Sequence, residues 1–121
     1  MTLGERQEYF AREEWELRAK AWEMGFAVRP KEFYRPVEMQ KIYVQQGRSK
    51  TMDSRHCDGT ACDYTLLLNG VVCTREQIKP LGDWWEARSP KHRWGGNWRG
   101  QIDSGKSSFI DAPHFEIQAQ I

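Results

Sequence analysis

The sequence lacks long apolar runs and shows no excess of either charge. No segment of the 121-residue chain reaches the ~18 consecutive apolar residues of a membrane-spanning helix, and the polar residues 1–12 contain no apolar core of a signal peptide. The 18 basic and 17 acidic residues nearly cancel and are spread along the chain, which argues against binding to nucleic acid or to an anionic membrane. We therefore expect a protein that is made in the cytoplasm, binds no nucleic acid and inserts into no membrane.

Cysteine is also scarce, and its three copies are an odd number in a chain without an export signal. This pattern favours reduced thiols over a disulfide framework. Cys57 and Cys62 lie close to His56 in the sequence, so a structural zinc site of the Cys-Cys-His type is an alternative, although no fourth ligand lies near them. A chain of this length supports one hydrophobic core and hence a single domain over residues 1–121.

The spacing of the apolar residues predicts an α+β fold, with helices packed on one face of a small antiparallel sheet. The expected elements are helices over residues 5–24, 36–47 and 74–88, an extended segment over 26–33, two strands within 61–73 and a last strand over 113–118. Asn69 and Gly70, which separate two apolar runs, are the strongest signal for a hairpin turn. Pro80 and Gly82 are expected to interrupt the third helix, because neither suits a helix interior.

Two further expectations concern the second helix and the region after the third. Met39, Ile42 and Tyr43 recur at helical spacing, which predicts that they face inward. Residues 89–108 are rich in Gly, Trp, Lys and Arg, and we interpret them as a loop in which His92 is an ordinary surface residue.

Two histidines and an aspartate have the chemistry of a catalytic zinc site. Such a site takes three protein ligands from histidine nitrogen and carboxylate oxygen and leaves the fourth position open, and His56, Asp63 and His114 supply that set. Gly59 allows the chain to fold back so that His56 and Asp63 converge. On the last strand, His114 and Glu116 share one face, which turns that face toward the metal.

Hydrolysis at zinc also needs a general base and a positive group near the scissile carbonyl. Asp111, three residues before His114, is the candidate base, although it is equally placed to form a turn before Pro113. Arg35 is the candidate positive group, because its guanidinium carries a fixed charge. Its alternative roles are to cap the second helix or to pair with Glu38.

Beyond these chemical arguments, the residues carry a resemblance to a family. Ser54, His56, Gly59, Ala61 and Asp63 form the pattern SxHxxGxAxD, and an acid, two residues and a histidine follow later in the chain. This order resembles the M15 family of zinc metallopeptidases, and the phage-type branch of the family in particular. The resemblance covers approximately residues 26–117. Its further segments are Tyr34–Gln40, Trp94–Gly96 and His114–Glu116.

The resemblance implies a hedgehog/DD-peptidase-like fold with one Zn²⁺ per chain. The implied site residues are the metal ligands His56, Asp63 and His114, the base Asp111, the substrate contact Arg35, and the further substrate-binding candidates Ser54, Gln40 and Trp94. These metal and catalytic roles agree with those reached from the chemistry of the residues.

The resemblance also implies a function in bacterial cell-wall degradation. We expect a monomeric endolysin of phage or prophage origin that acts on the peptidoglycan stem peptide and cleaves its L-alanyl-D-glutamate bond. Such enzymes wait in the host cytoplasm and act at the wall after release. One alternative is a D-alanyl-D-alanine carboxypeptidase or dipeptidase of the same family. Another is a zinc-containing module that binds a wall peptide without cleaving it.

Overall fold

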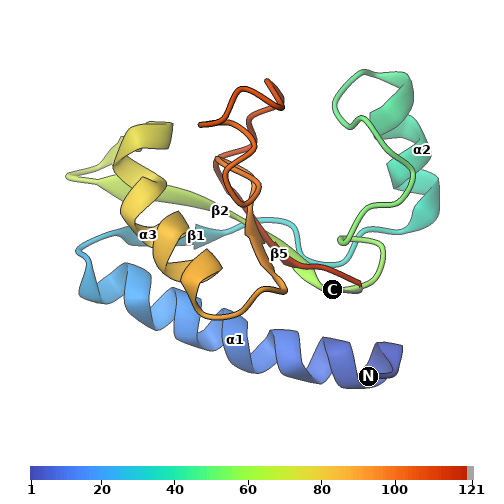
Figure 1. Cartoon of the computed structure of the whole chain (residues 1–121), viewed down its shortest axis with the longest axis horizontal. Coiled ribbons are helices and arrows are strands. Elements are labelled where there is room, and N and C mark those ends of the chain that lie inside the picture. The colour runs from blue at the N-terminus through green and yellow to red at the C-terminus, as the bar shows by residue number, and fades with distance from the viewer. Residues whose placement is uncertain (120–121) are drawn as a thin grey trace.

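The computed structural model describes residues 1–119, which form helices around a five-stranded antiparallel sheet (Figure 1). The helices are α1 (Leu3–Glu23), α2 (Val37–Gln45) and α3 (Arg75–Ala87). The strands are β1 (Ala27–Pro30), β2 (Ala61–Leu68), β3 (Val71–Val72), β4 (His92–Trp94) and β5 (His114–Ile117). The order across the sheet is β1-β2-β5-β4, with the short β3 beside β2. The predicted α+β fold is confirmed.

Helix α1 has clear start and stop signals in the sequence. Thr2 and Glu5 form a capping box, in which each side chain accepts a hydrogen bond from the backbone of the other. Phe10 and Leu17 are buried on its inner face, and Gly25, with φ of 94°, follows its end. No described helix, α1 included, combines the length and the apolar character needed to cross a membrane.

The two faces of the sheet have different tasks. On β2 and β5, Tyr64, Leu66, Phe115 and Ile117 point into the apolar core that α1 and α3 cover. The alternating positions point to the opposite face, where Asp63 of β2 lies directly across from His114 of β5. Helix α2 lies apart from α1 and α3 in Figure 1. Packing of the apolar side against the helices therefore holds in place the strands that carry the polar residues on their other side.

The predicted hairpin is confirmed, and the third helix differs from its prediction. Asn69 and Gly70 both have positive φ, 51° and 76°, as the tight turn between β2 and β3 requires. Helix α3 runs through Pro80 and Gly82 without interruption. At Gly82 the reason is packing, because a Cβ atom there would lie 2.1 Å from the ring of Trp94. The glycine thus allows α3 to lie directly on β4.

Three other expectations were wrong. Met39 and Ile42 are exposed, and the residue that α2 buries is Gln40. Strand β4 lies within the segment that was interpreted as a loop, and it pairs with β5 at the edge of the sheet. His92 of this strand is fully buried, with its Nε2 2.8 Å from the Tyr9 hydroxyl and its Nδ1 3.0 Å from the carbonyl oxygen of Trp85.

Candidate metal centre

His56, Asp63 and His114 come together on the polar face of the sheet. One ligand atom from each residue lies within 4.8 Å of the other two. The Asp63 Oδ1 atom is 3.2 Å from His56 Nε2 and 3.1 Å from His114 Nδ1. These separations are close to the roughly 3.4 Å between neighbouring ligands that zinc bonds of ~2.0–2.1 Å produce in a tetrahedral site. The geometry of the three donors therefore fits a small divalent cation.

Hydrogen bonds outside the trio fix which nitrogen of each histidine faces the centre. His56 Nδ1 lies 2.8 Å from the carbonyl oxygen of Phe33, which can only accept, so Nδ1 donates this hydrogen bond and Nε2 is the nitrogen that faces the centre. His114 Nε2 lies 2.7 Å from Glu116 Oε1, which leaves Nδ1 toward the centre. Carboxylate and carbonyl partners of this kind orient the histidine ligands of metal sites.

The electrostatics of the site also call for a cation. The Asp63 Oδ1 atom lies between His56 Nε2 and His114 Nδ1, so a carboxylate oxygen faces the two ring nitrogens that point toward the centre. Burial alone would lower the pKa of His114, but hydrogen bonds with the carboxylates of Asp63 and Glu116 raise it to about 10. Burial opposes ionisation of Asp63, yet its hydrogen bonds with His114 and His56 hold its pKa well below the usual value.

The two cysteines near His56 do not join this centre. Cys62 follows the alternation of β2, so it lies on the core side of the sheet, opposite to Asp63, and is fully buried. Cys57 is half-buried, and both thiols are free. Among the described residues, the potential metal cluster contains only the histidines and the aspartate. The two cysteines and His56 therefore do not form a zinc site of the Cys-Cys-His type.

Asp111 lies beside the three donors, in a turn that leads into β5. Its backbone N–H donates to Gly95, and its carbonyl accepts from the N–H of His114. A Cβ atom at Gly95 would lie 2.2 Å from the Asp111 carbonyl oxygen, so only glycine permits this close approach. Burial raises the pKa of the Asp111 carboxyl, which brings it closer to that of a general base working near neutral pH.

Arg35 is buried and held in a fixed orientation. Its Nε and Nη2 atoms donate to Glu32, and its Nη1 atom donates to Gln40 Oε1 at 2.7 Å. The guanidinium stacks on the ring of Tyr43 at 4.5 Å, and it makes no ion pair with Glu38. Of its five N–H donors, these bonds use three, so two remain for another acceptor in the pocket that Arg35 lines.

The three further substrate-binding candidates have different positions. Ser54 lies on the pocket wall, where its Oγ accepts a hydrogen bond from the N–H of His56. Gln40 is fully buried and donates to Ser49 and Thr51, so it holds Arg35 in place and does not itself reach the pocket. Trp94 is also fully buried, and its indole N–H donates to Ala112. Trp94 is a core residue, and the expectation that it contacts substrate was wrong.

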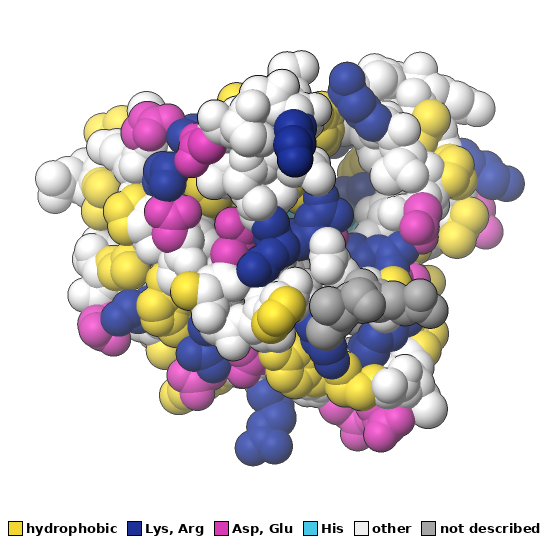
Figure 2. Space-filling view, viewed as in Figure 1, with side chains coloured by type: hydrophobic (Ala, Val, Ile, Leu, Met, Phe, Trp, Pro, Cys, Tyr) yellow, Lys and Arg dark blue, Asp and Glu magenta, His cyan; other side chains and the backbone are white. Residues whose placement is uncertain are grey.

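A pocket of about 500 Å³ opens over the centre, between the segment after α2 and residues 93–111. Figure 2 shows dark-blue Lys and Arg side chains on both sides of this hollow. Two residues of its wall, Arg93 and Trp98, were not among the predicted site residues, and both lie in the segment interpreted as a loop. The Trp98 ring lies 5.4 Å from the ring of His114. Alternation along β4 could have indicated Arg93, had the strand been recognised.

The His-Asp-His cluster, with both histidines buried, lies under an open pocket on an antiparallel sheet with helices behind it, and its three donors could hold a metal ion. The sequence profile described as phage L-alanyl-D-glutamate peptidase matches residues 18–118. The chain therefore belongs to this family, in agreement with the resemblance read from its motifs.

The L-Ala D-Glu endopeptidase ChiX of Serratia marcescens is among the solved structures that are similar to this chain. The similarity has a TM-score of 0.56 and 25% sequence identity, and it covers 75% of this chain and 66% of ChiX. The chain thus matches slightly less than two thirds of the length of ChiX. A comparison with curated protein sequences finds no significant match.

Proposed function

We propose that this protein is a zinc-dependent peptidoglycan peptidase that cleaves the L-alanyl-D-glutamate bond of the stem peptide. The observation that carries the proposal is the convergence of His56, Asp63 and His114, with the Phe33 carbonyl and Glu116 turning one nitrogen of each histidine toward the centre. Membership of the phage L-alanyl-D-glutamate peptidase family supports the choice of bond.

A zinc ion held by the three residues would supply Lewis-acid activation of water and of the scissile carbonyl. The protein's own contribution to proton transfer is Asp111. Its carboxylate takes the proton of the attacking water and delivers it to the nitrogen of the departing D-glutamate. The Asp111 side chain donates to and accepts from no described residue, so it is free for this task, while its backbone is fixed by Gly95 and His114.

Arg35 stabilises the negative charge that develops on the carbonyl oxygen of the scissile bond. Glu32, Gln40 and Tyr43 hold the guanidinium before substrate arrives, so little reorganisation is needed during the reaction. The two N–H groups that remain free can then donate to the oxygen. Ser54 contributes a second polar group on the same wall of the pocket.

In its biological setting, the protein is an endolysin of phage or prophage origin. It is made in the cytoplasm of the host bacterium, acts as a monomer and reaches the wall after release. The family match and the similarity to ChiX support this proposal.

The proposal is tested by digestion of purified peptidoglycan sacculi with the zinc-loaded protein and identification of the products by mass. A new free amine on D-glutamate is the expected result. Release of D-alanine would assign the protein to the carboxypeptidase branch instead. Binding to sacculi without any cleavage would make it a wall-binding module.

A further inference from the structure

The chemistry of the proposed substrate demands a recognition group that the site described so far does not supply. Glutamate has two carboxyl groups, and a peptide chain continues through only one of them. In an unmodified stem peptide, an L-alanyl-D-glutamate bond is therefore accompanied by a second, free carboxylate on the residue whose nitrogen is released. A pocket that selects this bond needs a cation beside the metal centre, on the side of the departing amine. The inference rests on the function proposed above.

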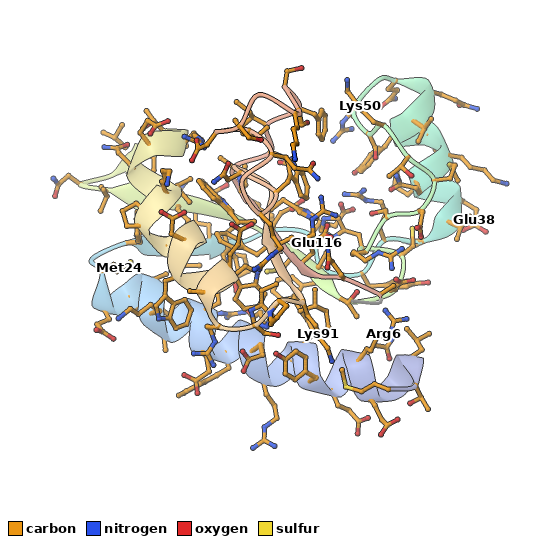
Figure 3. The ribbon with its side chains drawn as sticks, viewed as in Figure 1. Arg6, Met24, Glu38, Lys50, Lys91 and Glu116 are labelled. Atoms are coloured by element: carbon orange, nitrogen blue, oxygen red, sulfur yellow. The ribbon has the colours of Figure 1, made fainter. Side chains whose placement is uncertain are left out.

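Arg93 of β4 has the required position. It lies directly opposite Glu116 in the register of β4 and β5, so its side chain leaves the same face of the sheet as Glu116 and His114. Its Cα atom is therefore roughly 7–8 Å from that of His114, the usual diagonal separation in such a pair of strands. Figure 3 shows Glu116, its neighbour across the strands, near the centre of the view, and both residues line the pocket.

The guanidinium of Arg93 is held in place without using its donors. It lies over the ring of Trp98, 4.9 Å from the ring centre, and its Nη1 atom is 3.8 Å from Glu116 Oε2, which is too long for a hydrogen bond. Among residues 1–119, no acceptor takes a hydrogen bond from its five N–H groups, although the side chain is only 26% exposed. A planar, oriented guanidinium whose N–H groups bond to none of the described residues is suited to binding a carboxylate through two hydrogen bonds.

The charge of the surrounding wall favours the same ligand. Arg48 and Lys50 also line the pocket, and neither makes an ion pair with a carboxylate of the described residues. Arg48 stacks on Tyr43, and Lys50 lies over the ring of Phe109. Lys50 is labelled in Figure 3, beside the segment after α2. The pocket's exposed acid, Asp53, is already paired with Arg55. The excess of positive charge raises the local concentration of an anionic peptide.

We propose that Arg93 binds the free carboxylate of the D-glutamate residue and so makes the enzyme selective for peptides in which this group is ionised. Conversion of that carboxylate to an amide removes the charge and one acceptor oxygen. It leaves the scissile bond, the alanine and the remainder of the peptide unchanged. Arg93 is thus a specificity-determining residue, and Trp98 and Glu116 position it.

The test compares two peptides that differ in one group. Both contain L-alanyl-D-glutamate with an N-methylamide on the γ-carboxyl, and the α-carboxyl is free in one and amidated in the other. Their dissociation constants are measured by calorimetry with the zinc-loaded Asp111→Asn protein, whose turnover should be roughly 10²- to 10⁴-fold slower than that of the wild type. The same measurement is repeated with two double variants, which combine Asp111→Asn with Arg93→Met or with Arg93→Lys. The methionine keeps an apolar side chain over Trp98. Arg29→Met, at an exposed arginine of β1, is the matched control.

We expect the acid to bind roughly 10- to 100-fold more tightly than the amide when Arg93 is present. Arg93→Met should reduce this ratio to less than about 3-fold, Arg93→Lys should retain part of it, and Arg29→Met should leave it unchanged. An equal affinity for both peptides in the presence of Arg93 would overturn the proposal, as would equal weakening of both peptides by Arg93→Met. Cleavage is measured separately with Asp111 intact. Selective binding without cleavage of either peptide would refute the peptidase function and leave the carboxylate site standing.

Discussion

Replacement of Glu116 tests whether a carboxylate outside the metal ligands sets the affinity for zinc. Glu116 lies 2.7 Å from His114 Nε2, and it fixes the tautomer and the ring orientation that present Nδ1 to the metal. In Glu116→Ala, His114 is free to rotate and to place its proton on either nitrogen. Loss of such a partner typically weakens metal binding by about 10- to 100-fold.

The loss of zinc affinity should depend on which side chain replaces Glu116. In Glu116→Gln the amide oxygen still accepts the Nε2–H bond, but it lacks the charge that strengthens a bond to a buried imidazole, so its effect should fall between wild type and Glu116→Ala. Both residues are at least nine-tenths buried, and little water can replace the lost partner.

The assay is competition for zinc between the protein and a chelating dye of known affinity. Glu86→Ala is the matched control, because the Glu86 carboxylate likewise accepts hydrogen bonds, from the backbone N–H groups of Trp94 and Arg99, but touches none of the metal ligands. It should lower the unfolding temperature without changing the dissociation constant for zinc. If Glu116→Ala bound zinc as tightly as wild type, the orienting role of Glu116 would be refuted.

Three further predictions concern the rest of the site. Asp111→Asn should fold and bind zinc, but turnover of sacculi should fall by roughly 10²- to 10⁴-fold because an amide cannot take the proton. Asp111→Glu should keep part of the activity. If Asp111→Asn retained most of the wild-type rate, Asp111 would be a turn residue and not the base. Gly95→Ala should lower the activity, and it should lower the free energy of unfolding by about 1–3 kcal/mol, because the new Cβ collides with the Asp111 carbonyl. A crystal structure of this variant in which the turn has not moved would contradict the prediction. Cys57→Ser and Cys62→Ser should each retain one zinc per chain, and metal loss in either would restore thiolate ligation.

The convergence of His56, Asp63 and His114 could be predicted from the sequence because these residues belong to local patterns. His56 and Asp63 are separated by a short stretch with Gly59 at positive φ, and His114 follows the alternation of a strand. The pairing of β2 with β5 is then sufficient to bring Asp63 and His114 together. The hairpin turn and the amphipathic α1 were likewise predicted from local signals, the first from Asn69-Gly70 and the second from apolar spacing.

The errors arose where distant partners decide the structure. Strand β4 has only three residues, and its pairing with β5 brings together segments about twenty residues apart, which no local pattern encodes. Its recognition would have placed His92 in the core and Arg93 at the pocket. The orientation of α2 was missed because its anchor is polar: Gln40 is buried by hydrogen bonds to Arg35 and the segment after the helix, whereas apolar Met39 remains exposed.

The most direct test of the account is the zinc content of the purified protein after exhaustive dialysis, measured by mass spectrometry for wild type and for His56→Ala, Asp63→Ala and His114→Ala. Circular dichroism first verifies that each variant is folded. The account predicts one zinc per chain in wild type and little or none in each variant, with the loss of sacculus cleavage in the same samples. A folded variant that kept one tightly held zinc and full cleavage would contradict it.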